Sequence, residues 1–428
     1  MADEWDAEAV RKGVHGVAVD VADLYAYLDS RAAGASLVVP GEHRRVPPPV
    51  VGELHPPFGW RLDVSAFMTA VARTLTDQCA GYVLELRQNG AQIASQAWHY
   101  AINGSAEGQR VSPPVVLPSL DWGTGIRMHI ASCSKLITAI ALTKLLNQRD
   151  MPYDTPVYPW LPQYWHQGNN VKLITFADLM THKSGLDSTD TSDGPVDYES
   201  AMAAYEAGVP NTAVGGTPQY KNMNFTLGRI LIATLNGNID PTTAIGVPAL
   251  PGFDFLNNLL WDVVTYSAYT LYVQENIFAP AGVNGPTMTR PPGCALAYTF
   301  PVSGPGWNSG DLTFAAGAAG WHMSVDELLD IMGTFRRAGT IMTTAQAQTM
   351  LDDLFGIDPN GYYTTPAGPV YAKNGDWISS VNQWEQCAAY FLPQDMELAV
   401  FVNSPIGTDG KWLEGLVEGL YADNLLFL

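Results

Sequence analysis

Residues 129–146 read HIASCSKLITAIALTKLL, and this stretch decides how the rest of the chain is interpreted. Its apolar residues recur at helical spacing and cover most of the helix surface, which is typical of a helix buried inside a domain. Ser132 is expected in the first turn, and Lys135, three residues later, on the same face. The lysine amine can then reach the serine hydroxyl. A serine becomes a strong nucleophile when a base takes its proton, and a lysine is such a base once burial or a nearby cation lowers its pKa.

Length and composition describe a large globular protein. The chain has 428 residues, of which 47% are apolar and 15% are charged, so its composition is far from that of a disordered protein. A net charge of −20 makes nucleic acids and anionic membranes poor partners. No stretch approaches the ~20 apolar residues that a membrane helix needs, and the first residues carry no secretion signal. We therefore expect a soluble, cytoplasmic protein.

The chain divides into an extension and one large domain. The extension, residues 1–62, contains the run VPPPVVGELHPPFGW, whose prolines exclude a regular helix or a central strand. Residues 63–428 are expected to form the domain. Within it, Asn89 and Gly90 separate two strand-like runs, which is a strong signal for a hairpin.

The order of patterns predicts an α+β fold. Strand patterns occupy both ends of the domain, about 63–130 and 310–428, and helical patterns dominate the part between, about 131–309. We expect an antiparallel sheet built from both chain ends and flanked by helices, with a mostly helical region inserted. Residues 236–258 are rich in turn-forming residues and are expected to be an inserted loop.

A second group of chemically active residues follows the first at a distance. Tyr220 and Asn222 form the only Tyr-x-Asn in the chain. A tyrosine beside an ammonium group loses its proton more easily and can relay protons to a leaving group. The amide of Asn222 offers both a donor and an acceptor to an ester or amide substrate. Taken alone, the pair is equally typical of the start of a helix.

A third group lies at the start of the late strands. Lys373, Asn374 and Gly375 occur in VYAKNGDW. Glycine after a polar pair on an edge strand lets a ligand approach the backbone closely, because it has no side chain. The ordinary alternative is a strand lysine without any special function.

Other kinds of site find no support in the sequence. The eight histidines are too far apart to form a helical metal site, and the four cysteines do not have the spacing of zinc ligands. No phosphate loop, dinucleotide fingerprint or Gly-x-Ser-x-Gly elbow occurs. We therefore expect no metal and no cofactor.

Together, the three groups resemble the motifs of the serine β-lactamase and penicillin-binding-protein superfamily. The order Ser-x-x-Lys, Tyr-x-Asn and Lys-x-Gly is similar to that of the class C β-lactamase, DD-peptidase and family VIII esterase branch. Three connecting segments also resemble that branch: ITFADLMTHKSGL (174–186), YTLYVQENIFAPAG (269–282) and AAGWHMSVDELLDIM (318–332). The resemblance runs from about residue 63 to the C-terminus and implies a β-lactamase/transpeptidase-like fold.

The sequence also departs from the family pattern. Asn374 stands where threonine is common, and the acidic Asp376 stands where the family usually has a small residue. The Ser-Asp-Asn element of class A enzymes is absent, which argues against a class A mechanism.

The resemblance implies a mechanism. Ser132 attacks a carbonyl and forms an acyl-enzyme, Lys135 and Tyr220 share the role of general base, and Tyr220 passes a proton to the leaving group. The backbone N–H groups of Ser132 and Asp376 form the oxyanion hole. The residues expected to contact the substrate are Asn222, Lys373, Asn374, Gly375 and Asp376.

We expect a carboxylesterase-like serine hydrolase that acts on a small ester or amide, because β-lactamases and cell-wall peptidases usually work outside the cytoplasm. One alternative is an acyltransferase, for which Phe253, Phe255 and Trp307 would wall an apolar acyl pocket. Another is a β-lactamase or D-amino-acid peptidase of the same fold. A catalytically inactive ligand-binding homologue is the alternative from a different class. The sequence leaves the natural substrate and the oligomeric state open.

Overall fold

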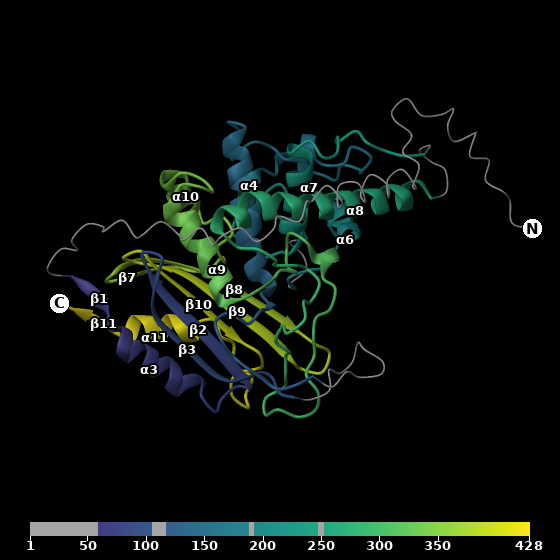
Figure 1. Ribbon diagram of the computed structural model, residues 1–428. Helices are drawn as coiled ribbons and strands as arrows, with labels where there is room; N and C mark the ends of the chain where they lie inside the picture. Colours follow the sequence, from purple (N-terminus) through teal and green to yellow (C-terminus); the bar gives the residue numbers. More distant parts are fainter. Residues whose placement is uncertain (1–58, 105–116, 188–191, 247–251) are drawn as a thin grey trace, which may run out of the picture.

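The computed structural model describes residues 59–104, 117–187, 192–246 and 252–428 (Figure 1). The predicted extension therefore lies outside the described residues up to residue 58. Figure 1 shows one large sheet with helices on both of its faces. The helical region lies on one side of this sheet, above it in the view.

Strands from both ends of the chain build the sheet. Its spatial order is β4 (Leu120–Asp121), β3 (Ala91–Ile102), β2 (Gly81–Gln88), β10 (Met396–Val402), β9 (Trp384–Leu392), β8 (Gly368–Ile378) and β7 (Tyr362–Thr365). The early and late strands meet where β2 pairs with β10, with Val83 opposite Phe401. All neighbouring strands are antiparallel. The predicted α+β fold is confirmed.

The hairpin turns follow from local backbone chemistry. Asn89 and Gly90 join β2 to β3 and both have left-handed φ values, of 51° and 78°. This is the type I′ turn that the Asn-Gly pair favours. Gln394 and Asp395, between β9 and β10, also have positive φ values. The two hairpins place their strands in register without a long connection.

Each face of the sheet has its own core. On one face lie α3 (Val64–Leu75) and α11 (Leu416–Asp423), which bury Phe67 and Val417 against the strands. Asp63 caps α3, because its carboxylate accepts a hydrogen bond from the N–H of Ala66 at 2.9 Å.

The other face carries a larger core and the helical region. Its helices are α4 (Ser134–Gln148), α5 (Phe176–Met180), α6 (Tyr198–Ala207), α7 (Met223–Leu235), α8 (Phe253–Val273), α9 (Val325–Gly333) and α10 (Thr344–Asp352). Helix α4 is buried along almost all of its length, as its apolar pattern predicts. It packs against α7, and the turn before it contacts β8. The start of α4 therefore lies between the helical region and the sheet.

Two predicted boundaries need correction. The predicted loop 236–258 ends earlier than expected, because α8 begins at Phe253. Asn257, a turn-forming residue by type, lies inside this helix and fastens the loop to it: its amide accepts from the N–H of Ile245 at 2.8 Å and donates to the carbonyl of Ile245 at 3.1 Å. The predicted domain start at residue 63 is also late, because Trp60–Leu62 form strand β1, which pairs with β11 (Leu425–Phe427). Three residues are too few to show a strand period.

In the parts of the chain that the structure describes, none of the helices combines the length and the apolar character needed to cross a membrane.

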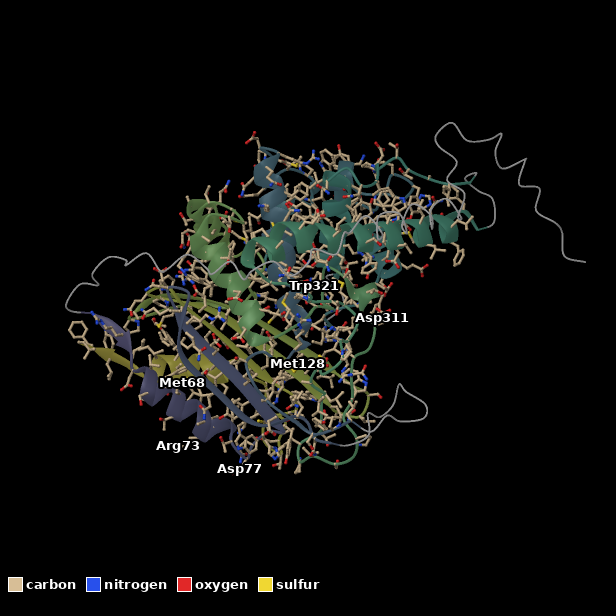
Figure 2. The ribbon with its side chains drawn as sticks, in the orientation of Figure 1. Met68, Arg73, Asp77, Met128, Asp311 and Trp321 are labelled. Atoms are coloured by element: carbon tan, nitrogen blue, oxygen red, sulfur yellow. The ribbon has the colours of Figure 1, made fainter. Side chains whose placement is uncertain are left out.

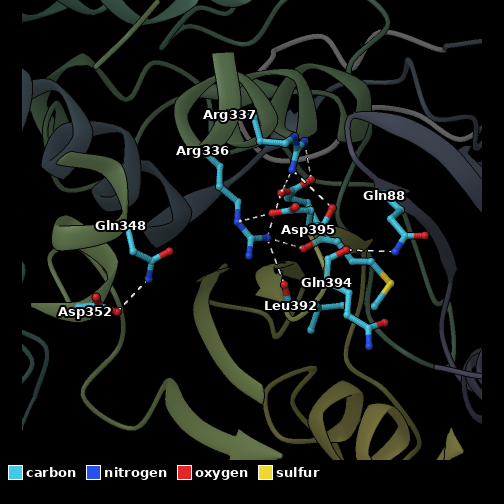
Figure 3. A network of polar contacts seen from close by, with 10 residues as sticks. Gln88, Arg336, Arg337, Gln348, Asp352, Leu392, Gln394 and Asp395 are labelled. Carbon is cyan, nitrogen blue, oxygen red and sulfur yellow. Dashed lines mark hydrogen bonds and ion pairs between the residues drawn. The ribbon is translucent and has the colours of Figure 1, made fainter. Parts of the chain in front are cut away.

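A buried carboxylate ties the segment after α9 to the sheet. Glu397 on β10 is fully buried and pairs with Arg337, whose Nη2 donates to its Oε2 at 2.8 Å, and with Arg336, whose Nη1 donates to its Oε1 at 3.2 Å. Figure 3 shows both arginines directed at the turn between β9 and β10, where Arg336 also donates to the carbonyl of Leu392.

We expect Glu397→Ala to lower the free energy of unfolding by about 3–5 kcal/mol, because it leaves two guanidinium groups partly buried without their partner. Urea unfolding followed by circular dichroism measures this loss. Asp395→Asn is the matched control: Asp395 also pairs with Arg336, at 3.6 Å, but its side chain is 51% exposed, so we expect a loss below ~1 kcal/mol. Asparagine tolerates the positive φ of this turn position. Equal losses in the two variants would contradict the role given to Glu397.

Candidate active site

A tight turn presents Ser132 at the start of α4. Residues Ala131–Cys133 form a 3₁₀ turn that continues into the helix, and Ala131 has a left-handed φ of 45°. The backbone N–H of Ile130 donates to the carbonyl of Trp321 at 2.9 Å, which fixes the strand before the turn. In Figure 2 the labelled Met128 and Trp321 lie where the sheet meets the helical region. The turn is therefore held from both parts of the domain.

Lys135 reaches the serine, as its spacing predicts. Its Nζ lies 2.8 Å from Ser132 Oγ, 2.7 Å from Asn222 Oδ1 and 2.9 Å from the carbonyl oxygen of Ala318. The side chain is completely buried. Burial, together with the nearby ammonium of Lys373, lowers the pKa of Lys135 well below its ordinary value.

Once deprotonated, the Lys135 amine has a fixed orientation in this setting. It has two hydrogens and one lone pair, and the oxygens of Asn222 and Ala318 are acceptors only. The two hydrogens therefore go to these oxygens, and the lone pair remains for the hydroxyl proton of Ser132. This is the arrangement that a general base requires.

Tyr220 lies beside the same group. Its ring centroid is 5.0 Å from the Nζ of Lys135 and 5.0 Å from the Nζ of Lys373. Burial raises the pKa of Tyr220, and the charge of Lys373 offsets only part of this rise. A lysine therefore does favour the deprotonation of this tyrosine, but the net shift is upward, because burial disfavours the phenolate more than the cation favours it.

The ring of His182 packs against the ring of Tyr220. The two rings stack with centroids 4.4 Å apart and an interplanar angle of 28°. His182 Nδ1 accepts a hydrogen bond from the backbone N–H of Lys221 at 3.1 Å, and burial lowers the pKa of His182 well below its usual value. The sequence gives no sign of this stacking, because the two residues are far apart in the chain.

Gly375 lets strand β8 approach the nucleophile's turn. A β-carbon at this position would lie 2.6 Å from the carbonyl oxygen of Ile130 and 2.8 Å from the backbone nitrogens of Ser132 and Cys133. These atoms belong to the backbone and cannot rotate away. The sequence predicts that a ligand approaches this glycine, whereas the group that approaches it in the structure is the turn carrying Ser132. The expectation of an edge strand is wrong, because β8 lies between β9 and β7.

We expect Gly375→Ala to lower kcat by about 10²-fold, because a displacement of ~1 Å at a reacting group has an effect of this size. It should also cost ~1–3 kcal/mol of stability through overpacking. Steady-state kinetics and thermal unfolding measure the two effects. Gly419→Ala is the control, because a β-carbon there meets nothing within 4 Å. A fully active Gly375→Ala enzyme would show that the strand and the turn can separate without consequence.

Lys373 is a buried cation that forms an ion pair with a carboxylate. Its Nζ pairs with Asp358, whose other oxygen accepts from the backbone N–H of Asn374 at 2.6 Å. Burial is the largest single influence on the pKa of Lys373 and lowers it, but Asp358, Tyr220 and Cys133 together raise the pKa overall. Lys373 therefore keeps its charge, and that charge is matched within the protein.

A pocket with a volume of about 360 Å³ opens over these groups. Its lining residues are Ser132, Asp193, Pro218, Tyr220, Asp358, Pro359, Asn360, Lys373, Asn374, Asp376 and Glu414. The predicted residues Ser132, Tyr220, Lys373, Asn374 and Asp376 thus share one cavity. Lys135 lies beneath it, and Asn222 bonds to Lys135.

Sequence reasoning missed the other carboxylates of this pocket. Asp193, Asp358 and Glu414 come from three distant segments, and none belongs to a motif around it. The sequence also suggested Phe253, Phe255 and Trp307 as walls of an acyl pocket, which the structure contradicts. Phe253 lines a separate cavity, whereas Phe255 is 65% exposed and Trp307 is buried.

Among the described residues, no group of three or more His, Cys, Asp or Glu side chains is arranged to hold a metal ion.

Residues 68–239, less than half of the chain, match the family model described as Beta-lactamase. No curated protein matches the sequence. Among solved structures, the octameric penicillin-binding protein homologue from Pyrococcus abyssi is 16% identical, with a TM-score of 0.57 over 84% of this chain and 76% of that one.

For two further structures, the match covers almost the whole of the solved chain. A D-stereospecific amidohydrolase from Streptomyces sp. is 18% identical, with a TM-score of 0.54 over 80% of this chain and 94% of that one. A β-lactamase/D-alanine carboxypeptidase from Pseudomonas syringae is 13% identical, with a TM-score of 0.57 over 84% of this chain and 97% of that one. At these identities the likeness shows the fold. Residues 68–239 thus resemble the β-lactamase family, and the described structure shares its fold with penicillin-binding-protein homologues, in agreement with the resemblance that the three motifs carry.

Proposed function

We propose that this protein is a serine hydrolase that cleaves a small ester or amide through an acyl-enzyme on Ser132. The observation that carries the proposal is the 2.8 Å contact between Ser132 Oγ and the fully buried amine of Lys135. A buried, neutral amine beside an accessible hydroxyl activates that hydroxyl as a nucleophile. The amidohydrolase and the carboxypeptidase among the similar structures support an amide or ester as the scissile group.

Acylation begins when Lys135 takes the proton of Ser132. The serine Oγ forms a bond to the substrate carbonyl carbon, and the carbonyl oxygen becomes an oxyanion. The backbone N–H groups of Ser132 and Asp376 are the proposed donors to this oxyanion, and each is worth about 3 kcal/mol in the transition state. The close approach of β8 to the turn at Gly375 supports this pairing, because it holds the two N–H groups on neighbouring segments.

Tyr220 is proposed to relay the proton. Its raised pKa keeps it a neutral phenol in the resting protein, so Lys135 is the base that activates the serine. As the bond to the leaving group breaks, Tyr220 donates its proton to that group and regains one from Lys135. Water then attacks the acyl-enzyme, and the same groups return its proton to Ser132 Oγ.

Covalent labelling tests the proposal. The protein is treated with a fluorophosphonate and digested, and the modified peptide is identified by mass. We expect one label, on Ser132, together with hydrolysis of p-nitrophenyl butyrate; nitrocefin in parallel reports β-lactamase activity. A label on a different serine, or no label and no turnover of either compound, would refute the assignment and favour a ligand-binding homologue.

A further inference from the structure

Carboxylates dominate the pocket over Ser132. Asp193, Asp358, Asp376 and Glu414 line it, and Lys373 is the one cationic side chain among its lining residues. Lys373 is already paired with Asp358. Three carboxylates therefore face the cavity without a matching cation in its lining.

We propose that the substrate carries an ammonium group, an inference that rests on the hydrolase function proposed above. Asp193, Asp376 and Glu414 hold this ammonium group while the carbonyl group of the substrate lies at Ser132. An anionic substrate would have to displace Asp358 from Lys373 and would also face the other three carboxylates. A cationic substrate leaves the ion pair between Lys373 and Asp358 intact. It is also attracted to the other three carboxylates, because opposite charges attract across a few ångströms even near the protein surface.

The three carboxylates come from separate parts of the fold and are held in place. Asp193 lies in the segment before α6, and its carbonyl accepts from the N–H of Asn222 at 2.8 Å, which ties it to the partner of Lys135. Asp376 follows Gly375 on β8, and Glu414 lies just before α11. The three carboxylates thus reach the nucleophile from distant segments, where they can contact a substrate and determine which substrate binds.

Asn374 points to a ligand independently of the charges. Its Oδ1 and Nδ2 are both buried, and neither has a hydrogen-bond partner among the residues that the structure describes. A buried amide without partners costs free energy. A substrate with an amide bond beside the scissile group supplies the missing donor and acceptor.

The electrostatics of the pocket give the attraction a pH dependence. The pKa of Asp376 is raised to about 6, mainly by burial and then by the charge of Asp193 and, more weakly, that of Glu414. The charges of Lys373 and Lys135 act in the opposite direction. Asp376 is therefore a carboxylate above pH 6 and a neutral acid below it. Preference for a cation should be complete above this pH and weaken below it.

Two esters of equal shape isolate the effect of charge. They are the p-nitrophenyl esters of 4-(trimethylammonio)butanoate and 5,5-dimethylhexanoate, which differ only in a nitrogen cation or a carbon at the branch point. We expect kcat/KM to be at least ~10-fold higher for the cationic ester, the factor that about 1.4 kcal/mol produces. The preference should fall as salt is raised, because salt screens exposed charges.

The double variant Asp193→Asn, Glu414→Gln should lower the ratio of the two kcat/KM values toward one, and Asp376 then accounts for any preference that remains. Glu275→Gln, which removes one exposed charge from the segment after α8, is the control and should keep the wild-type ratio. A wild-type ratio at or below one, or a ratio unaffected by the double variant, overturns the inference. Hydrolysis at a rate near that of the wild type in Ser132→Ala would instead refute the proposed function, so the two failures are distinguishable.

Discussion

Ser132→Ala is expected to lower kcat by about 10⁵–10⁶-fold and to abolish fluorophosphonate labelling, because no other group in the pocket replaces the nucleophile. The remaining donors still bind and polarise a carbonyl, so a small rate above that of water should persist. Turnover of p-nitrophenyl butyrate over hours, with active-site titration of the wild type, measures a loss of this size.

Ser134→Ala is the matched control for the nucleophile. Ser134 lies two residues further on and is completely buried, with its Oγ 3.4 Å from the backbone nitrogen of Trp321. It cannot reach a substrate, and its removal leaves the contact between Ser132 and Lys135 in place. We expect activity within a few-fold of wild type. An inactive Ser134→Ala variant with an active Ser132→Ala variant would exchange the two assignments.

Lys135→Met is expected to lower kcat by about 10³–10⁴-fold, because it removes the base while keeping an unbranched side chain of similar length. Acylation should slow most, so pre-steady-state mixing should show the loss in the first turnover. In the wild type, burial and the charge of Lys373 lower the pKa of Lys135, so the amine loses its proton below the ordinary range of lysine. Activity should therefore extend below that range and fall as acid protonates the amine.

Lys144→Met controls for the loss of a lysine from the same helix. Lys144 is in α4 but donates to the carbonyl of Ile341, away from the pocket. We expect this variant to keep wild-type kcat. Near-wild-type turnover in Lys135→Met would show that another group deprotonates Ser132, and Tyr220 would be the first to test.

Much of the fold could be predicted because its signals are local. The Asn-Gly turn and the apolar pattern of α4 each act through neighbouring residues, and each lies where it was expected. Pairing of β1 with β11 was not predictable, because each strand has three residues and its partner lies at the other end of the chain. The early start of α8 was missed because Asn257, which usually favours turns, bonds to a distant backbone instead.

The candidate site shows the same division. Ser132 and Lys135 are linked by helical geometry, so their contact follows from their spacing. Tyr220 and Lys373 could be added only through the family resemblance. The carboxylates of Asp193, Asp358 and Glu414 reach the pocket through tertiary folding alone, and no pattern in the sequence marks them. The raised pKa of Tyr220 likewise depends on how completely the fold covers it.

The pairing of β2 with β10 has a consequence for biosynthesis. Val83 meets Phe401 only after the chain has been synthesised beyond residue 401, and the intervening segment must be looped out for the two to join. Until then, the edge of β2 that later receives β10 is open to pairing with other chains. A nascent chain of this protein therefore exposes that edge until β10 has left the ribosome, which makes it a natural client for chaperones that shield unpaired strands.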